Sequence, residues 1–291
     1  MGEILIVGCN GQLGTDCMSV FGDAAIGLDF PEIDIADRFQ CLEKLNELQP
    51  SVIINCAAYT AVDACETDPS CWGVNADGPK HLAEWAAQNN AFLVHVSTDY
   101  VFPGNKPLFE ASSEENAPDP ISEYGKSKLA GEQAVLDSES NAAILRTAWL
   151  YGAYGNNFLK TMLRLTLQNP DKEFKVVADQ YGSPTWSYTL ARQIKAVVEH
   201  KATGIFHASS EGYCSWYDFA CYFLEQLGVA HHFIPCTTEE FPTPTKRPAN
   251  SILENALLKS LGINCFKNWD EELEAFVEKV GANVLEEVRA L

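Results

Sequence analysis

The sequence predicts an α/β fold, with a doubly wound parallel sheet followed by a smaller mixed α/β lobe. Through about residue 150, short apolar runs alternate with stretches of helical spacing, and a glycine-rich turn follows the first run. Continuous apolar runs are typical of parallel strands, which are buried on both faces. Their alternation with helices is typical of a sheet that is covered by helices on both sides.

Five apolar runs are expected to form the sheet: 4–7, 25–28, 52–55, 92–96 and 143–147. In the segments between them apolar residues recur every three to four positions, which predicts helices over 42–48, 80–88 and 126–136. We therefore expect residues 1–150 to form a first domain.

The region 151–291 is expected to form mainly the smaller lobe. It holds two predicted strands, 174–178 and 204–208, and three predicted helices, 158–168, 188–199 and 216–227. No Gly/Ser-rich linker separates the two halves. We therefore expect the lobe to pack closely on the first domain, with segments near 170–200 and 242–262 returning to that domain.

The turn after the first strand reads Gly-Cys-Asn-Gly-Gln-Leu-Gly at 8–14 and leads into a helical stretch. Glycines let a backbone approach a pyrophosphate, and the helix N-terminus stabilises its charge. A tight turn without a ligand would explain the glycines alone, but their place directly after a strand favours a dinucleotide site. The spacing of three and three, instead of two and three, is typical of short-chain dehydrogenases/reductases. We therefore expect a Rossmann-type domain at residues 1–150.

Tyr124 and Lys128 lie one helical turn apart, so they share a helix face on which an ammonium can stabilise a phenolate. Thr98 follows the strand 92–96, at the edge of the sheet where ligands bind. Alone, the Tyr/Lys pair is typical of a helix surface and the Thr of a strand-end cap. Their order after the glycine turn favours a site that delivers a proton during reduction of a carbonyl.

The chain has 291 residues and a formal net charge of −20, from 20 basic and 40 acidic residues. Phosphate contacts need clustered Lys and Arg, so this charge argues against a nucleic-acid partner. No apolar run approaches the roughly 20 residues that span a bilayer, and the N-terminus lacks the pattern of a signal peptide. We expect a cytoplasmic protein with no membrane partner.

The ten cysteines include no C-x-x-C pair. Several of them, such as Cys41 and Cys56, fall in apolar segments, where thiols behave as small hydrophobic groups. The six histidines show no H-x-x-x-H spacing. We therefore expect neither a redox centre nor a metal site.

Eight motifs are distributed along almost the whole chain, at 8–14, 55–63, 97–102, 124–132, 146–152, 155–158, 179–185 and 247–248. On these motifs the chain resembles the dTDP-4-dehydrorhamnose reductase family of the extended short-chain dehydrogenases/reductases. The early motifs indicate only the extended family. Ser-Thr-Asp-Tyr-Val-Phe at 97–102, Gly-Asn-Asn-Phe at 155–158 and the Pro-Thr motif at 184–185 indicate the rhamnose branch.

The resemblance implies reduction of the C4 ketone of dTDP-4-dehydro-L-rhamnose to dTDP-L-rhamnose by a reduced nicotinamide. Tyr124 would supply the proton, and Thr98 would hydrogen-bond the C4 oxygen. Lys128 would hold the nicotinamide ribose and lower the pKa of Tyr124. Related dehydratases carry Asp-Glu after the Thr, whereas Tyr100 follows Asp99 here, so simple reduction is favoured over dehydration or epimerisation.

The cofactor-binding residues expected from the turn and the resemblance are Gly8, Asn10, Gly11, Gln12, Leu13, Asp29, Asp34, Ile35, Ala57, Ala58, Tyr59, Tyr124 and Lys128. Asp29 follows the second strand, where a carboxylate bonds the ribose 2′-OH and repels a 2′-phosphate. This favours NADH. Arg38 could offset the repulsion and the family uses both cofactors, so NADH and NADPH both stay open with a lean towards NADH.

The expected substrate-binding residues are Thr60, Val62, Thr98, Asp99, Tyr100, Trp149, Asn157 and Arg247. Arg247 is the preferred cation for the diphosphate of a dTDP-sugar, with Lys246, Lys160 and Arg164 as further candidates.

A monomer or a homodimer is expected. In some relatives a carboxylate after the Pro-Thr motif helps to bind magnesium at a dimer interface. Tyr188 stands at the corresponding position, so no metal is expected.

Two alternatives stay open. The first is a non-catalytic NAD(P)-binding regulatory subunit, because a relative of this fold is the regulatory β subunit of methionine adenosyltransferase. The second is another nucleotide-sugar reductase or epimerase of the same superfamily.

Overall fold

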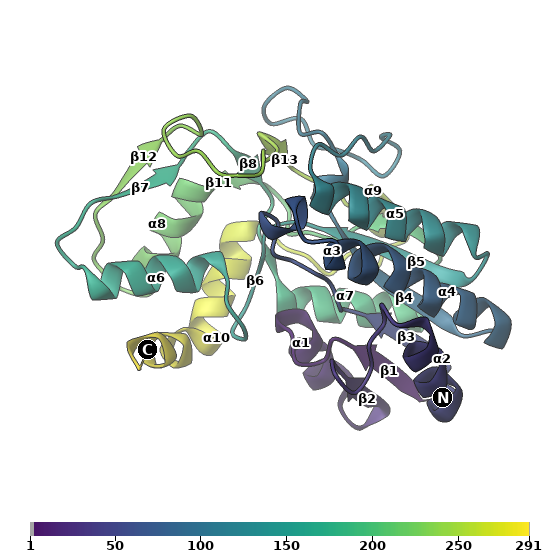
Figure 1. The fold of residues 1–291 in the computed structure, drawn as a ribbon. Helices are drawn as coiled ribbons and strands as arrows, with labels where there is room; N and C mark the ends of the chain where they lie inside the picture. The colour runs from purple at the N-terminus through teal and green to yellow at the C-terminus, as the bar shows by residue number, and fades with distance from the viewer. Residues whose placement is uncertain (1–2, 291) are drawn as a thin grey trace.

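In the computed structural model, which describes residues 3–290, a six-stranded parallel sheet forms the centre of the larger domain (Figure 1). Its strand order is β10-β5-β4-β3-β1-β2. The strands are β1 (Ile4–Val7), β2 (Ala25–Leu28), β3 (Val52–Asn55), β4 (Phe92–Thr98), β5 (Asn141–Thr147) and β10 (Gly204–His207). The order reverses at β1, and ligands of such sheets bind at the strand carboxyl ends near the reversal. The predicted doubly wound parallel sheet is confirmed.

Helices cover both faces of this sheet because side chains alternate between the faces along each strand. Ile4 and Ile6 pack with one layer of helices, and Leu5 and Val7 pack with the other. The first layer consists of α1 (Gln12–Phe21), α7 (Ser187–His200) and α9 (Ala256–Ser260). The second consists of α2 (Arg38–Leu48), α4 (Gly78–Asn89) and α5 (Glu123–Asp137).

The smaller lobe has its own core, rich in aromatic side chains such as Tyr151, Phe219 and Phe276. Its helices are α6 (Phe158–Gln168), α8 (Trp216–Gln226) and α10 (Trp269–Arg289). Its strands are β6 (Leu150–Tyr151), β7 (Phe174–Val177), β8 (Tyr181–Gly182), β9 (Thr185–Trp186), β11 (Cys214–Ser215), β12 (Phe233–Cys236) and β13 (Asn250–Ser251). Since β8 pairs antiparallel with β11 and parallel with β13, the lobe is mixed α/β, as expected.

The chain crosses between the two parts more than once. The strand expected over 204–208 in the second region is β10, and it lies in the large sheet instead, paired with β5. Its side chains Ile205 and Phe206 pack with opposite faces of that sheet, which explains this placement. The segment 170–200 is divided, because β7 lies in the lobe and α7 packs on α1.

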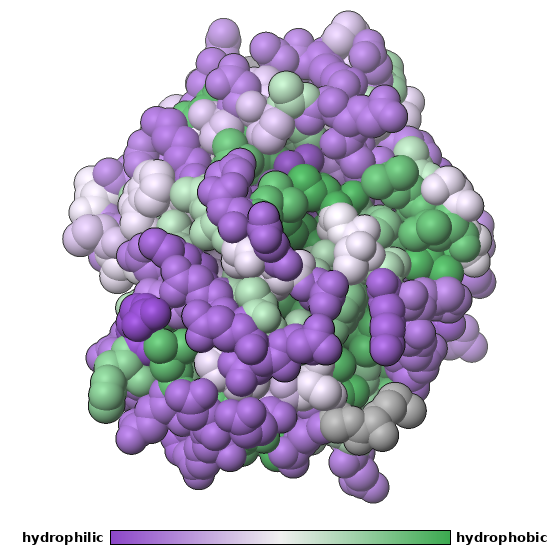
Figure 2. Space-filling model, turned by 90° about the vertical axis from the view of Figure 1, so that its right-hand side faces the viewer, coloured by the Kyte–Doolittle hydropathy of each residue, from purple (hydrophilic) through white to green (hydrophobic). Residues whose placement is uncertain are grey.

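Short helical turns lie between the longer elements. One of them, η1 (Gly22–Ala24), leads into the amino end of β2. The others follow the carboxyl ends of β3 and β4: η2 (Ala64–Glu66), α3 (Ser70–Trp72), the π-helical η3 (Gly73–Asp77) and η4 (Asp99–Val101). Figure 2 shows one face of the molecule, on which hydrophilic residues prevail and apolar residues gather in smaller patches. Among the helices described within residues 3–290, none is long and apolar enough to cross a bilayer.

Candidate active site

The glycine turn joins β1 to α1 so tightly that two of its positions exclude a side chain. Gly8 has φ +79°, and a Cβ there would lie 2.7 Å from the Ala57 nitrogen. A Cβ at Gly14 would lie 2.0 Å from the Gly8 oxygen. Gly11 is the N-cap of α1 and gives it no side-chain hydrogen bond. The first N–H groups of α1 therefore have no side-chain cap, and they fit a phosphate.

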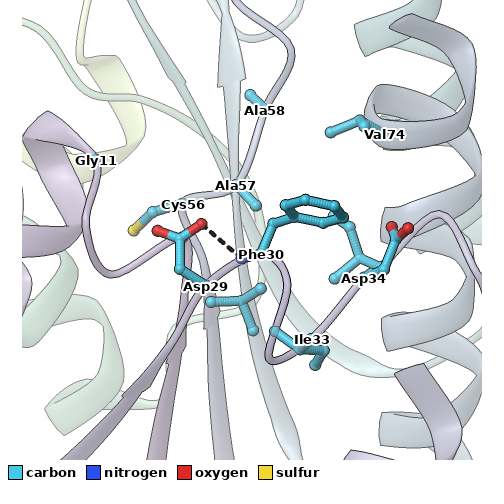
Figure 3. A pocket seen from close by; sticks show the side chains of 12 residues that line it. Gly11, Asp29, Phe30, Ile33, Asp34, Cys56, Ala57, Ala58 and Val74 are labelled. Atoms are coloured by element: carbon cyan, nitrogen blue, oxygen red, sulfur yellow. Dashed lines mark hydrogen bonds between the residues drawn. The ribbon is translucent and has the colours of Figure 1, made fainter. Parts of the chain in front are cut away.

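Beside the turn lies a first cavity of about 270 Å³. Its wall consists of Val7, Gly8, Gly11, Asp29, Phe30, Ile33, Asp34, Ile35, Cys56, Ala57, Ala58 and Val74. Figure 3 shows the Asp29 carboxylate and the Phe30 ring at this cavity. One Asp29 oxygen accepts the Asn10 N–H at 2.8 Å, and the other accepts the Phe30 N–H at 2.8 Å. Asp29 thus braces the glycine turn and places a carboxylate in the wall.

Arg38 is not in the wall of this first cavity. Its side chain is 61% exposed and pairs with Glu84 at 3.4 Å. In this geometry Arg38 therefore does not offset the negative charge of Asp29, although the sequence left that possibility open.

A second cavity, of about 540 Å³, shares Gly11, Cys56 and Ala58 with the first. It brings together the expected catalytic residues Thr98, Tyr124 and Lys128. All eight expected substrate-binding residues line it: Thr60, Val62, Thr98, Asp99, Tyr100, Trp149, Asn157 and Arg247. Two adjoining cavities with shared walls are the arrangement that a dinucleotide and a neighbouring substrate require.

Two expected cofactor residues line neither cavity. The backbone N–H of Asn10 donates to Asp29. The Tyr59 hydroxyl donates to Asp68 at 2.8 Å, and the Tyr59 backbone exchanges hydrogen bonds with the Asn75 side chain. Asn10 is exposed and Tyr59 is half-buried in this structure.

Helix α5 carries Tyr124 and Lys128 and packs closely on the η4 turn that follows β4. A Cβ at Gly125 would lie 2.3 Å from the Tyr100 carbonyl oxygen, so glycine permits the approach. The rings of Tyr124 and Tyr100 meet edge to face at 5.4 Å. The Lys128 ammonium donates to the Val96 carbonyl at 2.7 Å. The helix thus delivers both side chains to the carboxyl end of β4.

The Thr98 hydroxyl donates to Asp99 Oδ1 at 2.9 Å, and its oxygen accepts the Tyr100 N–H at 3.2 Å. Burial raises the pKa of Asp99 to about 6, although hydrogen bonds from Thr98 and Ser251 offset part of the effect. Burial thus disfavours the ionised form of Asp99, whose carboxyl oxygen accepts from Thr98 and orients it.

Burial raises the pKa of Tyr124 well above its ordinary value, a hydrogen bond with Thr98 lowers it, and the charge of Asp99 raises it further. Burial lowers the pKa of Lys128 to about 8, against the charge of Glu132. Lys128 is not among the groups that shift the Tyr124 pKa, and its ammonium donates to the Val96 carbonyl. Lowering of the Tyr124 pKa by Lys128 stays a prediction.

Arg247 projects into the second cavity beside Tyr100. Its guanidinium donates to the Tyr100 hydroxyl at 3.0 Å and to both Asp63 oxygens at 3.2 Å. The other candidate cations lie elsewhere, since neither Lys246 nor Arg164 lines a cavity and Lys160 is buried against Glu287 at 2.8 Å. Arg247 is therefore the candidate that the structure places in position for an anion.

A family model described as the RmlD substrate binding domain matches residues 2–282 of the chain. The chain belongs to this RmlD family.

Three relatives of this RmlD-family chain are named dTDP-4-dehydrorhamnose reductase, and each matches it over most of its length. It is 40% identical over 272 residues to a dTDP-4-dehydrorhamnose reductase of Aggregatibacter actinomycetemcomitans, covering 87% of this chain and 91% of the relative. A solved dTDP-4-dehydrorhamnose reductase of Clostridium acetobutylicum is 42% identical with a TM-score of 0.91, covering 96% and 99%. That of Bacillus anthracis, in complex with NADP, is 38% identical with a TM-score of 0.91 and the same coverage.

Several residues of the second cavity were not among the expected site residues of the RmlD-family chain. Trp216 begins α8 and stacks on Trp149 with ring centroids 3.5 Å apart. Thr147 ends β5, Cys56 follows β3, and both line the second cavity.

The expected residue Asn157 links the lobe to the glycine turn. Its amide nitrogen donates to Gln12 at 2.8 Å, and its amide oxygen caps α6.

One feature of the cysteines of the RmlD-family chain was not predicted. Cys65 and Cys71 form a disulfide, although they are not a C-x-x-C pair. Both are buried in a cluster with Tyr124, and Tyr59, Val62 and Tyr100 pack against them. Their pairing depends on the turn formed by η2 and α3, which composition does not reveal.

The region where a metal was considered is occupied by a cation of the chain itself. The Lys279 ammonium lies 3.3 Å from the centre of the Tyr188 ring. Among residues 3–290, no group of three His, Cys, Asp or Glu side chains is placed to hold a metal ion.

Proposed function

We propose that this RmlD-family protein reduces the C4 ketone of dTDP-4-dehydro-L-rhamnose to dTDP-L-rhamnose, with NADH or NADPH as the hydride donor. One observation carries the proposal. Thr98, Tyr124 and Lys128 line the second cavity. It shares wall residues with the first cavity, which lies beside the uncapped N-terminus of α1. The names of the relatives from A. actinomycetemcomitans and C. acetobutylicum support the same reaction.

The dinucleotide would be held by the glycine turn, Asp29 and Lys128. The turn fits a pyrophosphate because Gly8 and Gly14 leave no room for a Cβ and the α1 N-terminus has no side-chain cap. When bound, the reduced nicotinamide supplies the hydride. The protein's own residues have two remaining tasks: they orient the ketone and they protonate the C4 oxygen.

Tyr124 is the proposed proton donor. Burial keeps its phenol protonated, so a proton is available as negative charge develops on the C4 oxygen. The Thr98 hydroxyl donates to Asp99 in the free protein, so it has to rotate away from that carboxylate to donate to the C4 oxygen. Arg247 would bind the diphosphate, because its guanidinium lines the same cavity and offers further N–H donors.

For the cofactor we propose that both dinucleotides are used, with a preference for NADH. Asp29 supports this preference, since its charge in the first cavity disfavours a 2′-phosphate. The B. anthracis relative is described in complex with NADP, which supports use of NADPH as well.

A second candidate function is reduction of a related dTDP-4-keto sugar. Two relatives favour it: a dTDP-4-keto-6-deoxy-D-glucose reductase of Streptomyces niveus, 35% identical, and a probable dTDP-sugar 4-ketoreductase of Streptomyces antibioticus, 38% identical.

A cytoplasmic location and a monomeric or homodimeric state stay predictions, as does the division of the chain near residue 150.

One coupled assay tests both functions. Purified protein receives dTDP-4-dehydro-6-deoxyglucose and NADH or NADPH, with or without the 3,5-epimerase, and the products are identified by NMR. Oxidation that requires the epimerase and yields dTDP-L-rhamnose supports the main proposal. Oxidation without the epimerase supports the second candidate. No oxidation with either cofactor contradicts both and leaves the non-catalytic regulatory subunit.

A further inference from the structure

Thr147 lines the second cavity, and its buried hydroxyl has no hydrogen-bond partner in the part of the chain that the structure describes. Thr147 ends β5 and is only 8% exposed. Within residues 3–290 its Oγ1 has no hydrogen-bond partner, yet the residue lines the cavity. A buried hydroxyl that makes no hydrogen bond is costly, so a ligand group that pairs with it would bind more tightly.

The position of Thr147 in the sheet indicates which part of a ligand it meets. The first cavity is lined by residues at the ends of β1 and β3 and by Asp29 after β2. The second cavity lies at the ends of β4 and β5, where Thr98 and Thr147 are partners in register. A dinucleotide that starts in the first cavity and passes the glycine turn therefore brings its nicotinamide end towards β5.

The wall near Thr147 suits a flat ring with one polar substituent. Partners in register have side chains on the same face of a sheet, so Thr147 and Thr98 face the layer that contains α1. Leu13 of α1, Val96, Ala148 and Leu150 also line the cavity, and their side chains are apolar. A hexose carries hydroxyls around its ring and would leave several of them unpaired here, whereas a nicotinamide presents a single carboxamide.

We propose that the Thr147 hydroxyl hydrogen-bonds the carboxamide of the bound nicotinamide and so fixes which face of the ring is turned towards Thr98 and Tyr124. In this hydrogen bond the hydroxyl oxygen accepts from the NH₂ of the carboxamide. This inference rests on the proposed function and deepens it, because Thr147 becomes a positioning residue for the hydride donor.

The test measures dinucleotide binding without sugar, by the fluorescence of NADH and of its reduced 3-acetylpyridine analogue, which lacks the amide NH₂. Thr147→Val removes the hydroxyl at nearly constant shape and should weaken NADH binding about fivefold, the effect of one neutral hydrogen bond. Binding of the analogue should change by less than about twofold. Thr147→Ser keeps the hydroxyl and should bind NADH as the wild type does.

Thr166→Val is the matched control. Thr166 is also buried, but its hydroxyl donates to the Met162 carbonyl within α6 and it lines neither cavity. This variant should bind both dinucleotides normally. If Thr147→Val weakens both dinucleotides equally, or neither, the proposed hydrogen bond is wrong. If the wild type binds no dinucleotide at all, the proposed function itself fails, so the two failures are distinguishable.

A second readout follows the face of the ring with NADH deuterated at either C4 position. The wild type should transfer deuterium from one position only, and Thr147→Val should transfer a detectable share from the other. Strict transfer from the same single position in Thr147→Val would contradict the role of Thr147 in fixing the ring face.

Discussion

The Lys128 ammonium donates a 2.7 Å hydrogen bond to the backbone carbonyl of Val96, two residues before Thr98 on β4. The contact ties α5 to the strand whose end carries the proposed substrate contact. It also keeps a charged group in a buried position, where the charged form of a lysine is disfavoured.

The activity of the protein should therefore fall as the pH rises through about 8. Burial lowers the pKa of Lys128 to about 8, so the ammonium is present below that pH and is lost above it. We expect kcat/KM for NADH to show this alkaline limb, because that parameter reports the free enzyme. In Lys128→Arg, whose guanidinium stays charged, activity should be lower but the limb should be absent. A wild-type profile that stays flat to pH 10 would contradict the assignment.

Asp99→Asn should stabilise the protein at alkaline pH. The folded pKa of Asp99 is raised to about 6 from 3.8, so folding favours its protonated form. That contribution is complete below about pH 4 and is lost as the pH rises through 6. At pH 8 the ionised carboxylate costs at most about 3 kcal/mol. Thermal unfolding should give a higher Tm for Asp99→Asn at pH 8 and a similar Tm at pH 4. Equal values at pH 8 would show that the carboxylate is not penalised.

Asp29→Asn should shift the cofactor preference towards NADPH. Asparagine keeps one oxygen as an acceptor for one of the two backbone N–H groups, its NH₂ cannot accept the other, and the charge that disfavours a 2′-phosphate is removed. We expect the ratio of kcat/KM for NADPH to that for NADH to rise by roughly tenfold, about 1.4 kcal/mol of differential binding. Arg38→Ala is the control and should leave the ratio unchanged, since Arg38 pairs with Glu84 outside the cavity. A ratio that Asp29→Asn does not move would remove Asp29 from cofactor selection.

Loss of the Cys65–Cys71 disulfide should lower the free energy of unfolding by roughly 2 kcal/mol, the loop-closure value for so short a loop. Urea unfolding with and without dithiothreitol measures the effect, and the double variant Cys65→Ser, Cys71→Ser should match the reduced protein. Cys221→Ser, at a free cysteine of the lobe, should change little. Ten free thiols in the denatured, untreated protein would show that the bridge does not form.

The parts of the site that the sequence predicted correctly lie at the ends of predicted strands. Gly8, Thr98 and Trp149 each follow or end an apolar run, and parallel strands bring their carboxyl ends to one edge of the sheet. The predicted substrate residues Thr98, Asp99 and Trp149 share one cavity for this reason.

The parts that could not be predicted depend on contacts between distant segments. Lys160 reads as a free cation in the sequence, but α10 places Glu287 beside it, 127 residues away. Trp216 reaches the cavity only because α8 packs against the strand end that carries Trp149. The residues of the strand predicted at 204–208 do not indicate its partner strand, which is β5 of the large sheet. The spacing of residues in the sequence predicts local structure, but it does not predict contacts between segments that are distant in the chain.

The turnover of Tyr124→Phe tests the central claim most directly. The variant keeps the ring that packs against Tyr100 and removes the proposed proton donor. In the coupled assay with the epimerase, kcat should fall on the order of a hundredfold or more, as expected for loss of a general acid. The Kd for NADH should stay within about twofold of the wild-type value, because the glycine turn, Asp29 and Lys128, which are proposed to hold the dinucleotide, are unchanged. Turnover near that of the wild type would contradict the role of Tyr124 as the proton donor.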